Sequence, residues 1–179
     1  MIENNLLKNR IVFLIGEVNY QTSYEVITRL IYLDSVNNED ISLYIDSPGG
    51  DVMQGLAIID CMKIIKSKVS TYCIGTAYSM GAVILACGAK GKRYSLPNSE
   101  IMIHSPSSAM KGKADDIALS SQRLNEAKAK IINILAKTTN KTKSQINKCF
   151  INDKFMNINE AQKFGIIDII IKSNWFNKY

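Results

Sequence analysis

Short apolar runs alternate with longer segments of helical periodicity through most of this chain, and this alternation constrains the fold more than any other feature. The expected strands are 11–15, 41–45, 69–74, 101–103 and 166–171, and the expected helices are 24–33, 52–65, 79–87, 114–138 and a short one after Thr142. Strands separated by helices in this way predict an α/β fold with a mostly parallel sheet. With 179 residues, 46% of them apolar, and no Pro-rich linker, we expect one domain over residues 1–179.

The longest predicted helix carries a narrow apolar stripe. Ile117, Leu124 and Ile131 recur at heptad spacing, while the other faces are polar. Such a stripe is typical of a packing edge, either against its own domain or against another subunit. The segment 105–113 before this helix is polar and irregular, so we expect it to protrude or to line a groove.

Composition and charge argue against several classes of protein. The net charge of +6 comes from scattered lysines, which favours a solvated surface over a nucleic-acid site. No apolar run approaches the ~20 residues of a membrane helix, and the first residues lack the features of an export signal. The four cysteines form no C-x-x-C pair, and with a single histidine in the chain we expect no metal site and no cofactor.

Ser79 is the first candidate for chemistry. It lies in Ala77-Tyr-Ser-Met-Gly81, between a predicted strand and a predicted helix. This pattern resembles the nucleophile turn G-x-S-x-G, with Ala at the first position. A serine that merely caps the helix is the alternative, and the pentapeptide alone favours it.

A glycine pair could supply hydrogen-bond donors nearby. Gly49 and Gly50 end the segment Ser47-Pro-Gly-Gly50, directly after a predicted strand. Glycines allow backbone N–H groups to point at a ligand oxygen, so this segment and the Met80 N–H could form an oxyanion hole. A plain turn explains the glycines equally well.

His104 is the only histidine of the chain and therefore the obvious candidate for a general base near neutral pH. It closes a predicted strand, where a purely structural role is the alternative. A Ser-His-Asp hydrolase would need a carboxylate partner for this ring. Spacing does not choose among the candidates, which are Asp46, Asp51, Asp60, Asp115, Asp116, Asp153 and Asp168.

Several separate motifs, taken in order, closely resemble the ClpP peptidases of family S14, which have the ClpP/crotonase fold. The likeness covers about residues 6 to 171, and the matching segments are Tyr44-Ile-Asp-Ser-Pro-Gly-Gly50, Ser79-Met-Gly-Ala82, Gly88-Ala-Lys-Gly-Lys-Arg93, Leu96-Pro-Asn-Ser99, Ile101-Met-Ile-His104, Asp153-Lys-Phe-Met156, Glu160-Ala161 and Gly165. The resemblance implies a repeated β-β-α superhelix with a protruding handle at about residues 105–138.

The resemblance also implies a site and a reaction. It places the nucleophile at Ser79, the general base at His104 and the orienting acid at Asp153, with Gly49, Gly50 and Met80 around the oxyanion and the substrate. The implied activity is that of a serine endopeptidase that cleaves unfolded polypeptides through an acyl-enzyme.

The family further implies a homo-oligomer of two stacked seven-membered rings, joined through the handle, and a partner AAA+ ATPase that feeds the chains in. This sequence has no G-x-x-x-x-G-K-[ST] loop, so ATP would act in the partner. The implied location is the cytoplasm or, alternatively, the plastid stroma.

Three departures from the family pattern bear on these expectations. The chain begins close to its first predicted strand, so the axial loop is expected to be reduced or missing, which affects ATPase docking. Tyr78 stands where the family has a small residue, so we expect an altered substrate pocket. Ser105-Pro-Ser-Ser108 replaces Gln-Pro-x-Gly-Gly and would change substrate pairing or the ring contact.

Two other functions remain open from the sequence. One is a non-catalytic or weakly active ring subunit of a mixed complex, which the altered loop and the missing axial segment favour and the complete set of Ser79, His104 and Asp153 disfavours. The other is an acyl-CoA-processing relative with the same fold, which would need the oxyanion donors but no serine triad.

Overall fold

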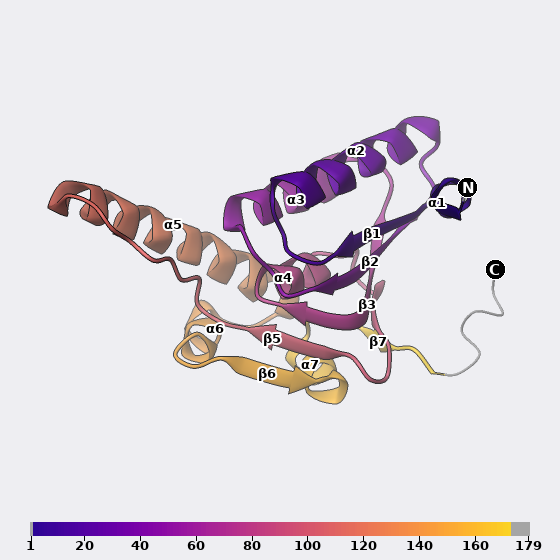
Figure 1. Ribbon diagram of the computed structural model, residues 1–179. Coiled ribbons are helices and arrows are strands. Elements are labelled where there is room, and N and C mark those ends of the chain that lie inside the picture. Colours follow the sequence, from indigo (N-terminus) through magenta and orange to yellow (C-terminus); the bar gives the residue numbers. More distant parts are fainter. Residues whose placement is uncertain (1, 173–179) are drawn as a thin grey trace.

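A computed structural model describes residues 2–172 of the chain (Figure 1). The strands are β1 (Ile11–Ile15), β2 (Ile41–Ser47), β3 (Val69–Tyr78), β4 (Arg93–Ser95), β5 (Glu100–Ile103), β6 (Lys154–Asn157) and β7 (Ile169–Ile170). The helices are α1 (Ile2–Lys8), α2 (Tyr20–Val36), α3 (Val52–Ile64), α4 (Met80–Ala86), α5 (Ala114–Thr139), α6 (Lys143–Cys149) and α7 (Ile158–Phe164). The predicted α/β class is confirmed, and the arrangement is that of the ClpP/crotonase-like fold.

The sheet divides at β3. Strands β1, β2, β3, β4 and β7 lie side by side in that order and are all parallel. The first half of β3 pairs with β4 through Thr71–Cys73, and its second half pairs with β5 through Thr76–Tyr78. Strand β6 then adds to β5 in antiparallel orientation. The predicted, mostly parallel sheet is therefore confirmed, and the end of β3 stands beside β5.

Alternation along the strands separates the two faces of the sheet. Helices α2 and α3 lie over one face of the sheet (Figure 1), and Val12, Leu14 and Leu43 are buried in the core. The opposite face carries a row of aromatic rings across four neighbouring strands, in which consecutive rings lie 4.6 to 5.5 Å apart between centroids. This row consists of Phe13, Tyr44, Tyr72 and Tyr94. Helix α4 lies within the core, and all its residues are buried.

Helix α5 has two different halves. Its second half packs on the domain through the buried side chains of Ile131 and Leu135. Its first half projects from the body of the domain (Figure 1), and Ile117 and Leu119 are 40% and 50% exposed there. The predicted apolar stripe therefore serves intramolecular packing only at its C-terminal end. Residues 104–113, which lead into α5, have no helix or strand, in agreement with the irregular segment predicted there.

Some strand boundaries differ from the prediction. The strand expected at 166–171 is reduced to Ile169–Ile170, because Gly165 adopts a left-handed conformation and Ile166 and Ile167 are buried outside the ladder. Strand β3 runs four residues beyond the predicted 69–74. Strand β6 was not predicted, because Lys154–Asn157 has no β-branched residue.

Two buried arginines tie distant parts of the chain together. Arg10 donates to the backbone carbonyls of Leu33, Asn37, Glu39 and Asp40, which end α2 or follow it. Arg93 donates to both carboxylate oxygens of Asp168 and joins β4 to the segment before β7. Within the described residues, no helix is both long and apolar enough to cross a membrane.

Candidate active site

Ser79 sits at the junction of β3 and α4 in a backbone conformation that is rare for residues other than glycine. Its φ and ψ are 51° and −120°, and its N–H donates to Met102 O at 2.9 Å. The side chain makes no capping hydrogen bond to α4, so the capping role considered for it is wrong. A strained serine between a strand and a helix is the geometry of a nucleophile turn.

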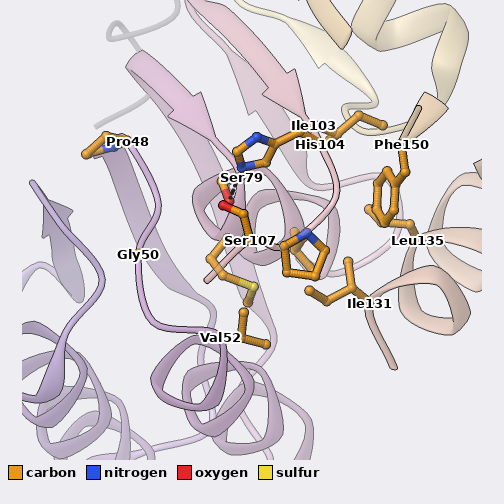
Figure 2. Close-up of a pocket in the computed structure, with 13 residues that line it drawn as sticks. Pro48, Gly50, Val52, Ser79, Ile103, His104, Ser107, Ile131, Leu135 and Phe150 are labelled. Carbon is orange, nitrogen blue, oxygen red and sulfur yellow. Dashed lines mark hydrogen bonds between the residues drawn. The ribbon is translucent and has the colours of Figure 1, made fainter. Parts of the chain in front are cut away.

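The serine hydroxyl instead meets the histidine. Ser79 Oγ lies 3.0 Å from His104 Nε2. Figure 2 marks this contact with a dashed line. On the other side of the ring, His104 Nδ1 lies 3.3 Å from Asp153 Oδ1. The side chains of His104 and Asp153 are 28% and 59% exposed, so solvent reaches the carboxylate end of this chain of contacts. The structure thus brings the three predicted residues together in the order hydroxyl, imidazole, carboxylate.

The other carboxylates considered as partners of His104 are engaged elsewhere or lie on α5. Asp46 accepts hydrogen bonds from Thr76, and Asp51 caps α3 through Gln54 N. Asp60 pairs with Lys63, and Asp168 pairs with Arg93. Asp115 and Asp116 lie in the first turn of α5. The tertiary structure thereby resolves an ambiguity that the spacing left open.

The glycine pair approaches the serine closely. A Cβ atom on Gly49 would lie 2.6 Å from Ser79 Cβ and 2.7 Å from Tyr78 O, so no larger residue fits. The Gly49 N–H is already donated to Ser47 Oγ at 3.1 Å. Gly50, with φ of 145°, lines the pocket beside Ser79, as does Met80, whose N–H opens α4 and has no acceptor within that helix. Gly50 and Met80 are therefore the members of the predicted set with N–H groups available to a ligand.

The pocket beside Ser79 has a volume of about 230 Å³ and one mainly apolar side. Phe150, Leu135 and Ile131 gather next to the serine and histidine (Figure 2). Pro106 and Ser107 of the irregular segment also line it, which confirms that this segment borders a groove. Sequence reasoning missed Phe150 and Leu135 as pocket residues, although Leu135 lies one helical turn after Ile131 of the predicted apolar stripe.

Tyr78 does not line this pocket. Its hydroxyl donates to Glu100, and its ring packs edge-on against Phe155 with 5.8 Å between centroids. The expectation that Tyr78 alters the substrate pocket is therefore not supported for the pocket beside Ser79, because the side chain is engaged with Glu100 of β5 and Phe155 of β6. The hydrogen bond to the Glu100 carboxylate raises the pKa of Tyr78 to about 12.

Two of the cysteines are poor rivals to Ser79 as nucleophiles. All four are free, and burial raises the pKa of Cys73 to about 11 and that of Cys87 to about 12. A thiol with so high a pKa stays protonated near neutral pH and is a poor nucleophile.

A comparison with protein families decides the relationship of the chain. The family model described as Clp protease matches residues 1–174. The chain belongs to the Clp protease family. It is therefore a ClpP-type peptidase, a hydrolase, as the resemblance implied. The match extends beyond residues 6 to 171, over which the motifs alone indicated the likeness. It does not favour the alternative of a non-catalytic ring subunit.

Proposed function

We propose that this Clp protease family member is a serine endopeptidase whose nucleophile, general base and orienting acid are Ser79, His104 and Asp153. The observation that carries the proposal is the unbroken series of contacts, 3.0 Å from Ser79 Oγ to His104 Nε2 and 3.3 Å from His104 Nδ1 to Asp153 Oδ1. The strained backbone at Ser79 supports the same assignment, because strain of this kind persists where it serves a function.

In the acylation step, Ser79 Oγ attacks the carbonyl carbon of a peptide bond while His104 Nε2 accepts the hydroxyl proton. This role requires the tautomer of His104 with its proton on Nδ1, facing Asp153. The negative charge of Asp153 then stabilises the imidazolium that forms. The proton passes from Nε2 to the leaving amine as the peptide C–N bond breaks, which leaves an ester on Ser79.

The tetrahedral intermediate needs donors for its oxyanion. The N–H groups of Gly50 and Met80 are the candidates, and removing one donor of this kind typically costs about 3 to 4 kcal/mol of transition-state stabilisation. In deacylation, water repeats the attack on the ester with His104 again as the base. His104 then returns this proton to Ser79 Oγ as the ester bond breaks, which releases the new carboxyl end and restores the serine.

The proposal extends to assembly. Stacked heptameric rings that admit unfolded chains from an AAA+ ATPase would confine the reaction, and cytoplasm or plastid stroma would suit such a complex. The exposed apolar residues of the first half of α5, Ile117 and Leu119, suit a contact between rings. On the outer side of α2, Tyr24, Ile31 and Tyr32 are each more than half exposed and suit a contact between neighbours.

The test combines labelling with assembly. The purified protein should react with a fluorophosphonate at Ser79 and cleave a fluorogenic peptide, and both activities should disappear in Ser79→Ala. Ser35→Ala removes an exposed serine of α2 and serves as the matched control that keeps both activities. Sedimentation of the same sample shows whether active material is a tetradecamer. Full cleavage by Ser79→Ala would refute the assignment.

A further inference from the structure

We propose that Tyr78 is a positioning residue that holds Asp153 beside His104, an inference that rests on the proposed function. Tyr78 directly precedes Ser79, yet its side chain contacts neither the serine hydroxyl nor the pocket beside it. It reaches across the sheet to β6, the strand that follows Asp153. Tyr78, Glu100 and Phe155 are called the tyrosine brace below.

The brace spans three strands. Tyr78 on β3 is paired with Met102 on β5, and Met102 is paired with Phe155 on β6. Two strands that are separated by a third strand lie about 9.6 Å apart, which is twice the usual spacing of about 4.8 Å between neighbours. The two rings nevertheless meet, with centroids 5.8 Å apart and planes at 81°, above the buried Met102. This contact is a side-chain link from the nucleophile strand to the edge strand.

The hydroxyl of Tyr78 fixes the direction of its ring. It donates to the carboxylate of Glu100, which lies two residues before Met102 and therefore on the same face of β5. A phenol is protonated at neutral pH in any case, so the hydroxyl keeps the proton that it donates to the carboxylate. The ring is thus held at one end by its backbone and at the other by Glu100.

The brace lies beside His104 and Asp153. His104 follows two residues after Met102, and Asp153 precedes Phe155 by two, so all four side chains share one face. Continuing the β5–β6 register by one step from Ile103 and Lys154 places His104 opposite Asp153. Phe155, which Tyr78 contacts, therefore belongs to the residue pair next to His104 and Asp153 on this face, two positions along the ladder.

Asp153 has little else to hold it. Its side chain is 59% exposed, and His104 provides its one polar side-chain contact within residues 2–172. Strand β6 has only four residues and is paired on one side, with β5. The carboxylate therefore depends on the placement of β6, and Tyr78 adds a tie from β6 to the more deeply placed β3.

The test uses the single histidine as its reporter. Nitrogen-15 shifts from magic-angle-spinning NMR distinguish the two neutral tautomers of His104, and a contact with Asp153 favours the proton on Nδ1. We expect Tyr78→Ala to populate the other tautomer and to slow phosphonate labelling of Ser79 roughly tenfold through misplacement of the carboxylate. Tyr78→Phe keeps the ring and should slow labelling less. Tyr20→Ala, which removes a 75% exposed ring at the start of α2, is the control and should change neither readout.

A double-mutant cycle separates positioning from a general loss of structure. In an Asp153→Asn background, Tyr78→Ala should cause no further slowing, since its effect acts through the missing carboxylate. An unchanged tautomer and rate in Tyr78→Ala, or an equal slowing in both backgrounds, overturns the proposal. If thermal unfolding shows that Tyr78→Ala does not fold, Phe155→Leu removes the same contact from an exposed position and is judged by the same outcomes. A wild-type protein that resists the phosphonate would refute the proposed function, while the tautomer comparison would still decide the role of Tyr78.

Discussion

Gly49 lies against Ser79 so closely that a single added carbon atom would touch the serine side chain. The distance from that atom to Ser79 Cβ would be 2.6 Å, and Met80 N would be 3.0 Å away. The glycine pair thus fixes how near the loop after β2 comes to the start of α4. This approach is what allows Gly50 and Met80 to line one pocket.

Gly49→Ala should therefore slow labelling of Ser79 strongly. The new methyl group must displace Ser79 or the loop, and a displacement near 1 Å typically costs about a hundredfold in rate. Gly16→Ala is the matched control, because Gly16 also has a positive φ but nothing lies within 4 Å of an added Cβ. Gly16→Ala should lower the unfolding midpoint and leave the labelling rate intact. Equal rates in the two variants would contradict the prediction.

Asp153→Asn should slow peptide cleavage by roughly a hundredfold to a thousandfold. The amide keeps the size of the side chain but removes the charge that stabilises the imidazolium. The loss should fall short of the ~10⁴-fold typical of a buried triad aspartate, since Asp153 is 59% exposed and solvent replaces part of its effect. Asp115→Asn, on the first turn of α5, serves as control for the loss of one carboxylate. Steady-state rates of the fluorogenic peptide measure both.

The ion pair of Arg93 and Asp168 should make the free energy of unfolding depend on pH in the acid range. Burial alone would raise the pKa of Asp168, but hydrogen bonds from Arg93 and its charge outweigh that effect and hold the pKa below its ordinary value. A carboxyl group whose pKa is lowered in the folded state contributes its full stabilisation when the pH is above its ordinary pKa of about 3.9. This stabilisation disappears as the pH falls below that value and through the lowered folded pKa.

Urea unfolding at several pH values checks this prediction. At pH 7, Asp168→Asn should destabilise the protein by about 3 to 5 kcal/mol, because it leaves the charge of the buried Arg93 unpaired. The difference from the wild type should shrink as the pH approaches 3. Asp60→Asn removes an exposed ion pair with Lys63 and should cost less than about 1 kcal/mol at any pH. A difference that does not vary with pH would mean that Asp168 is not charged in the fold.

The pocket beside Ser79 should favour substrates with an apolar side chain at the residue that supplies the scissile carbonyl. The apolar lining offers no charge to a polar side chain and is formed by Val52, Val83, Ile103, Ile131, Leu135 and Phe150. A panel of peptides that differ only at this residue should show Leu or Met cleaved at least tenfold faster than Asp or Lys. Ile131→Val should shift the preference toward larger side chains. Equal rates across the panel would show that this pocket does not hold the substrate side chain.

The helices and strands with a strong hydrophobic pattern along the sequence were predicted well. The apolar runs of β1 and β2 and the long periodicity of α5 depend on neighbours along the chain, so they could be predicted. Strand β6 could not, because its pairing with β5 joins segments far apart in sequence and its own residues have little strand propensity. The direction of the Tyr78 side chain could not be predicted for a similar reason, since it depends on Glu100 and Phe155 rather than on its neighbour Ser79.

By itself the sequence determined the α/β class, the strand-to-helix turn that carries Ser79, and a single histidine able to act as a base. Only the tertiary structure decided which of seven aspartates meets that histidine, which apolar side chains form the pocket, and where Tyr78 points. The physical reason is that periodicity and caps act within a few residues, whereas the contacts around His104 close loops of many residues and exist only once β3, β5 and β6 lie side by side.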